Sequence, residues 1–204
     1  ETVTTLVDAN LVSKKTFGYD QYNNPTDVYE YDFGTGAPGP LIRRSLTDYV
    51  TFNNGVDYAG DHNIHIRNLQ LQTQVFDAGG IKRAETFYEY DLYDNSPNHA
   101  SLLNRPGISG LDSGFTTGYT KRGNVTKTSR ALLNNSGGIT GWVNSHAQYD
   151  IAGNGVKAID ANGNPTTLDF SDRFGSPGDD AQQNTPPSEL NEQTSYAFAT
   201  KVTN

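Results

Sequence analysis

The feature that most constrains this chain is a recurring unit: an aromatic residue, an Asp, and then a turn rich in Gly or Asn. The clearest copy is Tyr149-Asp150 before Gly153-Asn154. The tetrapeptide Tyr-Glu-Tyr-Asp also occurs twice, at 29–32 and 88–91. Gly and Asn tolerate the positive φ angles that tight hairpin turns require. The unit therefore predicts a β-hairpin with an aspartate at its turn.

The spacing of these units agrees with hairpins. Aspartates of neighbouring units lie 12 residues apart at 20 and 32, 14 at 77 and 91, 10 at 150 and 160, and 12 at 160 and 172. Such intervals suit a strand of about five residues plus a tight turn. The Asp at each turn can accept backbone N–H groups that the strands leave free. The predicted fold is all-β: antiparallel β-hairpin repeats forming a continuous twisted sheet or ribbon, with long loops and essentially no helix.

The residues of the unit are predicted to have structural roles. Tyr residues two positions apart face the same side of a strand, so their rings are expected to form ladders across neighbouring strands. Asp, Gly and Asn are expected to form the turns. The residues are Tyr19, Asp20, Tyr29, Tyr31, Asp32, Phe76, Asp77, Tyr88, Tyr90, Asp91, Tyr119, Gly123, Asn124, Tyr149, Asp150, Gly153, Asn154, Asp160, Gly163, Asn164, Asp172 and Gly175.

We expect a single β region over residues 1–204, with irregular insertions at about 34–40, 93–118 and 175–193. These segments are rich in Pro, Gly and polar residues and interrupt the spacing of the units. The chain begins with Glu1 rather than Met, which suggests a processed product or a piece of a longer protein.

Composition excludes several classes of protein. The net charge is −8, which is the wrong sign for non-specific binding to nucleic-acid phosphates. The chain has no Cys, so disulfides and thiol chemistry are absent. No apolar run approaches the ~20 residues that span a bilayer, so membrane insertion is not expected.

The segment from Tyr149 to Gly175 resembles the YD-repeat (Rhs-repeat) family. Its order is Tyr-Asp-x-x-Gly-Asn, then Asp160-x-x-Gly-Asn with Thr following, then Asp172-Arg-Phe-Gly. Ser171 replaces the aromatic residue before Asp172, and Thr120 replaces the Asp expected after Tyr119. The resemblance implies a long β-ribbon that winds into a shell around a payload on a bacterial surface or in a secreted protein. The self-cleavage signature at the end of such repeats has no match here.

Candidate chemical sites are weak in this sequence. His62 and His65 would face opposite ways on a strand, and the other histidines, His99 and His146, are far away in the sequence. The run from Asp160 to Asn164 is similar to the start of a calcium loop, but Ser171 stands where the closing Glu is needed. No nucleophile elbow occurs, although strand-borne carboxylates can meet without any motif. We therefore expect no catalytic residues, no cofactor, no metal and no enzyme activity.

Two function classes follow from these observations. The first is a non-catalytic scaffold, a segment of an extracellular or cell-surface shell, stalk or self-assembled filament. Its partners would be the remainder of a longer chain or identical copies, because sheet edges recruit further strands. The alternative is a carbohydrate-binding or adhesive module in which exposed Tyr and Trp142 stack on surface glycans.

Overall fold

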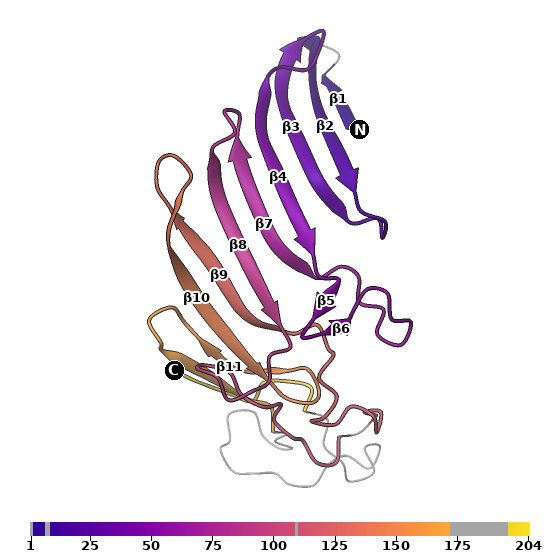
Figure 1. Cartoon of the computed structure of the whole chain (residues 1–204), viewed down its shortest axis with the longest axis vertical. Coiled ribbons are helices and arrows are strands. Elements are labelled where there is room, and N and C mark those ends of the chain that lie inside the picture. Colours follow the sequence, from indigo (N-terminus) through magenta and orange to yellow (C-terminus); the bar gives the residue numbers. More distant parts are fainter. Residues whose placement is uncertain (1, 7–8, 109, 172–195) are drawn as a thin grey trace. The chain divides into compact units, whose positions relative to one another are not determined.

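The computed structural model describes residues 2–6, 9–108, 110–171 and 196–204, and Figure 1 shows them as strands and connections. No α-helix occurs in these ranges, and none of their segments could cross a membrane as an apolar helix. Eleven strands form one sheet in the order β1-β2-β3-β4-β7-β8-β9-β10-β11-β12-β13, while β5 and β6 form a separate pair. The prediction of an all-β fold of antiparallel hairpins is confirmed. The strand bounds are β1 Thr2–Leu6, β2 Leu11–Tyr19, β3 Pro25–Thr35, β4 Leu41–Tyr49, β5 Phe52–Asn53, β6 Val56–Asp57, β7 Gln70–Asp77, β8 Lys82–Tyr90, β9 Val125–Leu133, β10 Ile139–Tyr149, β11 Gly155–Ile159, β12 Pro165–Asp169 and β13 Lys201–Thr203.

The chain groups into two compact units. The first contains residues 1–89 and 128–144, and the second contains residues 90–127 and 145–204. The predicted insertion at 34–40 lies in the first unit and the one at 93–118 lies in the second. The third, at 175–193, falls outside the described residues.

The first unit also contains a long connection that the sequence reasoning did not single out. Residues 50–69 join β4 to β7 and contain the short β5–β6 hairpin. Its ends are held together by the bond from Val50 N to Leu69 O, at 2.8 Å. Three buried residues of this connection, Val50, Tyr58 and Ala59, form the apolar core of the first unit.

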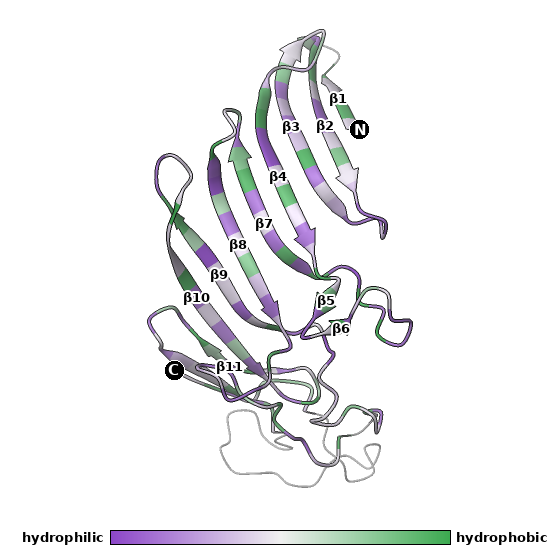
Figure 2. Cartoon of the chain, viewed as in Figure 1, coloured by the Kyte–Doolittle hydropathy of each residue, from purple (hydrophilic) through white to green (hydrophobic). Residues whose placement is uncertain are grey.

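Strand β3 shows how these sequences stabilise a sheet with little burial. Glu30 lies directly opposite Lys15 on β2 and Arg43 on β4, so three alternating charges share one face. Tyr29 and Tyr31 occupy the other face, as strand alternation requires. None of β2, β3, β4 and β7 contains a fully buried residue. Figure 2 shows the same strands with hydrophilic and hydrophobic residues interspersed. This part of the sheet is therefore specified mainly by cross-strand pairs and by turns.

The second unit has a larger apolar core. Its buried apolar residues are Tyr90, Leu102, Ile151 and Ile159, which come from strands, a turn and the connection between β8 and β9. Leu103 of that connection pairs with the end of β10: its N–H donates to Tyr149 O at 3.0 Å. Ile151 N in turn donates to Leu103 O at 3.0 Å. The connection is thus packed against the β10–β11 turn.

Candidate functional site: the aspartate turns

The turn between β10 and β11 shows the geometry of the recurring unit. Asp150 N donates to Asn154 O and Gly153 N donates to Asp150 O, both at 3.0 Å. The Asp150 carboxylate accepts Ala152 N at 3.0 Å, Asn154 N at 2.9 Å and Asn154 Nδ2 at 3.1 Å. We call this arrangement, in which the first side chain of a five-residue loop binds the loop's own N–H groups, the aspartate turn. It satisfies inside the loop the donors that the strands cannot pair.

Glycine is required in this turn for its backbone angle. Gly153 has φ of +89°, and a Cβ atom added there would meet nothing within 4 Å. A larger residue would therefore fit in space but would be strained in conformation. Asn23 takes the same place in the β2–β3 turn with φ of 65°, as only Asn and Asp commonly do among residues with a side chain.

The same pattern of bonds closes four more hairpins. Asp160 binds Asn162 N and Asn164 N at 2.9 and 2.8 Å, and Asn164 Nδ2 at 3.0 Å. Asp20 and Asp77 accept the corresponding N–H groups in the β2–β3 and β7–β8 turns. Asn134 does so in the β9–β10 turn, where its Oδ1 accepts Ser136 N and Gly138 N. This last turn does not match the recurring unit of the sequence, because Asn134 is not an aspartate and follows no aromatic residue.

Asp91 makes an aspartate turn whose loop is split by an insertion. Its carboxylate accepts Arg122 N at 2.8 Å, Gly123 N at 2.7 Å and Asn124 N at 2.9 Å. Asp91 N donates to Asn124 O at 2.9 Å, as in the unsplit turns. The sequence pattern places Gly123 and Asn124 in a unit that begins at Tyr119. The structure corrects this, since the aspartate of that turn is Asp91 and Tyr119 lies inside the insertion.

Asp32 shows a smaller version of the same insertion. Asp32 N donates to Pro40 O at 2.9 Å, and Gly39 N donates to Asp32 O at 2.8 Å. These are the two backbone bonds of the aspartate turn, with residues 33–36 added to the loop. The insertion at 34–40 therefore extends a turn and leaves the hairpin intact.

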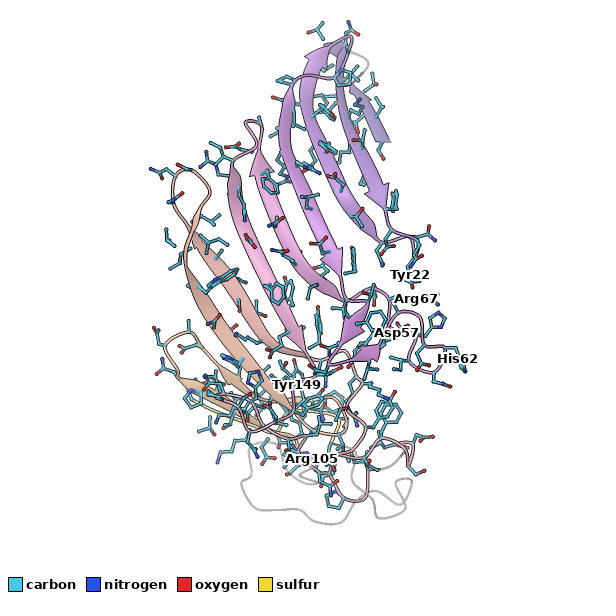
Figure 3. All side chains as sticks on the ribbon, viewed as in Figure 1. Tyr22, Asp57, His62, Arg67, Arg105 and Tyr149 are labelled. Atoms are coloured by element: carbon cyan, nitrogen blue, oxygen red, sulfur yellow. The ribbon has the colours of Figure 1, made fainter. Side chains whose placement is uncertain are left out.

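Asp150 differs from its counterparts because it is fully buried, with no exposed surface. Arg105 from the β8–β9 connection donates through Nε to Asp150 Oδ2 at 2.9 Å, and the two side chains form an ion pair. The Arg105 guanidinium also lies 4.8 Å from the centre of the Tyr196 ring. Figure 3 shows Arg105 and Tyr149 in this crowded region. The insertion between β8 and β9 is thus bound to the β10–β11 turn by a buried ion pair.

The first unit contains a related contact. Asn24 of the β2–β3 turn donates through Nδ2 to Arg67 O at 2.6 Å. The Arg67 guanidinium lies 4.8 Å from the centre of the Tyr22 ring, and Figure 3 labels both residues. In the second unit Asn154 Nδ2 likewise donates to a carbonyl, Tyr196 O, at 2.9 Å. In both units the final Asn of a turn binds a second segment of chain.

The tyrosine rings of β3 lie beside cations from neighbouring strands. Tyr29 and Tyr31 share a face of the strand, and the Arg44 guanidinium lies 5.1 Å from the Tyr29 ring centre. Lys14 Nζ lies 4.8 Å from the ring centre of Tyr31. These are cation–π contacts between neighbouring strands. Tyr149 donates its hydroxyl to Val125 O at 2.8 Å, and burial raises the pKa of that hydroxyl.

The remaining ring positions have varied surroundings. Tyr19 is 60% exposed and its ring lies 6.2 Å from that of Phe17. Phe76 lies opposite Arg44 and Lys82 in the sheet. Tyr90 is buried, whereas Tyr88 is partly exposed on the same strand. Asp172 and Gly175 lie outside the described residues.

Some carboxylates of the turns and strands, among them Glu30 and Asp160, have lowered pKa values. Hydrogen bonds from Arg43 and then Lys15 lower the pKa of Glu30 to about 2. The Asn164 side chain and the backbone N–H groups of its turn lower the pKa of Asp160. By contrast, burial and the adjacent Asp91 raise the pKa of the Tyr93 hydroxyl. These carboxylates are stabilised as anions, which suits structural acceptors.

The aspartate considered as a calcium ligand is hydrogen-bonded within its own turn. Both oxygens of Asp160, the residue considered for calcium, accept hydrogen bonds from its own loop. His62 and His65 are exposed in the 50–69 connection. Within the described ranges, no group of three or more His, Asp or Glu side chains is placed to hold a metal ion.

Comparisons with known proteins add no assignment. A scan against protein-family models finds no match to this chain, and a search of curated protein sequences finds none either.

Proposed function

We propose that this chain is a non-catalytic scaffold, a segment of a β-ribbon wall in a secreted or cell-surface YD-repeat protein. The observation that carries the proposal is the repeated aspartate turn. The same bonds recur at Asp20, Asp77, Asp150 and Asp160, although the strands between them differ in sequence. A repeated connector that is independent of strand sequence is typical of an architecture that lengthens by adding hairpins.

The order of the strands supports the same proposal. Apart from the β5–β6 hairpin, each strand pairs with strands that are its neighbours along the chain, so the sheet can be extended without rearranging its interior. Such a ribbon needs partners at its edges. Strand β1 is exposed along its whole length and has a described neighbour only in β2. The remainder of a longer chain or an identical copy would supply the next strand.

Electron microscopy of the purified chain over a range of concentrations tests this function. We expect fibres or closed walls, because identical copies can pair at the strand edges when no other strand is present. Sedimentation velocity on the same samples gives the size distribution. Small particles of one copy at every concentration would contradict assembly from identical copies. Turnover of a substrate at a pocket would contradict the scaffold role itself.

The exposed rings favour one second candidate, an adhesive module that binds glycans. Trp142 is 41% exposed on β10 and Tyr19 is 60% exposed on β2. Trp142 is the only tryptophan, so its fluorescence reports on that site alone. Quenching by neutral oligosaccharides would support this candidate, and unchanged emission at saturating sugar would contradict it.

A further inference from the structure

The second unit contains a cavity of about 320 Å³ that does not belong to any of the aspartate turns. One wall is the sheet formed by β10 to β13, and the other is the segment around Leu103 and Arg105. That segment is held in place by the backbone bonds of Leu103 and by the ion pair between Arg105 and Asp150. Each wall of the cavity is therefore held in place by its own bonds, one by the strand pairing and the other by the contacts of Leu103 and Arg105.

The strand register places polar groups together on the sheet wall. Lys157 lies opposite Gln148 on one side and Thr167 on the other, and Thr167 lies opposite Thr203. Residues directly opposite in a ladder share a face, so these side chains form one row across four strands. Asp169 and Lys201 are opposite each other and lie two residues beyond Thr167 and Thr203. All of these residues line the cavity.

The charges around this cavity are not balanced. Arg105 is neutralised by the buried Asp150. Lys157 and Lys201 take part in no ion pair or hydrogen bond in the part of the chain that the structure describes, and both line the cavity. Among the described residues that line the cavity, Asp169 is the one that carries a carboxylate. A chain with a net charge of −8 thus presents a locally cationic cavity.

We propose that this cavity binds one unit of an acidic saccharide, with Lys157 and Lys201 holding its anionic group. The volume is that of roughly ten water molecules, so a bare inorganic anion would leave most of it unfilled. Thr167, Thr203 and Gln148 supply groups that both donate and accept hydrogen bonds, which suits sugar hydroxyls. The Asp169 carboxylate, whose Oδ1 accepts Ser171 N at 2.9 Å, adds a negative charge that repels a simple anion, so a ligand that carries hydroxyl groups besides its anionic group fits better.

Titration calorimetry with a uronate disaccharide, a sulfated disaccharide, a neutral disaccharide and inorganic sulfate tests the proposal. We expect one or both acidic disaccharides to bind at least tenfold more tightly than the neutral sugar and than sulfate. The two acidic probes distinguish a carboxylate from a sulfate ester as the recognised group. Added salt should weaken binding, because the attraction to partly exposed ammonium groups is screened.

Three single variants locate the site. Lys157→Gln and Lys201→Gln should each weaken binding of the acidic disaccharide by roughly tenfold, the usual loss for one charged hydrogen bond. Lys127→Gln removes the same charge from β9 in the same unit and should bind as the wild type does. Thermal unfolding should be unchanged in all three variants, since neither cavity lysine forms an ion pair with another described residue.

Several results would overturn the proposal. One is equal binding of neutral and acidic disaccharides, and another is sulfate binding as tightly as the best sugar. A third is no heat of binding with any acidic probe, and a fourth is an equal loss in Lys127→Gln. The scaffold function is independent of these outcomes, because it depends on the turns and the sheet edges.

Discussion

At the scale of single residues, the aspartate side chain has two distinct roles in its turn. One carboxylate oxygen binds the N–H groups of the loop, and the other accepts the Asn side chain four residues later. Asn134 performs the first role without a charge. An amide is therefore sufficient for the backbone part of the turn, and the carboxylate matters where it meets a further donor.

This distinction predicts different effects for Asp150→Asn and Asp160→Asn. Asp150→Asn leaves Arg105 buried beside a neutral group, and we expect it to lower the free energy of unfolding by about 3 kcal/mol. Asp160→Asn alters an exposed turn with the same loop bonds and should change the melting temperature little. Urea denaturation followed by circular dichroism measures both. Equal losses would show that the Arg105 pair contributes nothing specific.

Glu30 predicts a dependence of stability on pH. Its pKa falls from the ordinary value of 4.5 to about 2 in the folded chain, so folding favours the ionised form. The stabilisation is complete above about pH 4.5 and is lost as the pH falls toward 2. Lys15 and Arg43 are about half exposed, so we expect only about 1–2 kcal/mol.

The comparison of wild type with Glu30→Gln tests this dependence. At pH 6 the variant should be less stable by that amount, and the difference should disappear near pH 2. Denaturant unfolding at intervals between these values gives the profile. A difference that stays constant over the whole range would assign the effect to packing and not to charge.

At the scale of elements, contiguous turns could be predicted from the sequence and split turns could not. Asp150 and Asn154 are four residues apart, so the spacing alone identifies their hairpin. Asp91 and Asn124 are separated by 33 residues, and nothing in the intervening sequence indicates that they meet. Arg44 and Lys14, the cations beside Tyr29 and Tyr31, lie directly opposite these rings in the sheet. They could not be predicted, because the sequence does not state the register between strands.

The split turn predicts that its insertion can be removed. Deleting residues 93–121 leaves Asp91-Leu92-Arg122-Gly123-Asn124, which has the spacing of an unsplit aspartate turn. We expect the β8–β9 hairpin to form with its register unchanged, because the bonds of Asp91 to Gly123 and Asn124 need only that loop. The shortened chain should nevertheless melt at a lower temperature, since Asp150 loses Arg105.

Combining this deletion with Asp150→Asn separates the two effects. The substitution should cost much less in the shortened chain than in the full one, because its buried charge partner has already gone. Amide hydrogen exchange on β8 and β9 reports the register. Loss of protection along both strands would show that the insertion is needed to form the hairpin.

At the scale of the whole molecule, β1 is the strand at one edge of the described sheet. This strand, Thr2–Leu6, is exposed throughout and contains no charge, proline or bulge, the features that usually protect an edge from pairing. The recurring unit of the sequence does not include this strand, and the sequence does not indicate whether another strand covers it. An uncovered edge of this kind should bind a strand from an identical copy.

Val3→Glu should therefore reduce self-association without unfolding the chain. Val3 is 51% exposed and lies opposite Lys14, so the new carboxylate has a cationic neighbour within the chain but repels a second copy. We expect the concentration at which assemblies form to rise roughly tenfold, corresponding to about 1.4 kcal/mol. Leu132→Glu is the matched control, because Leu132 is equally exposed but lies on β9, which has neighbours on both sides. Sedimentation velocity over a concentration series compares the three proteins, and equal shifts in both variants would mean that general charge, not the β1 edge, governs association.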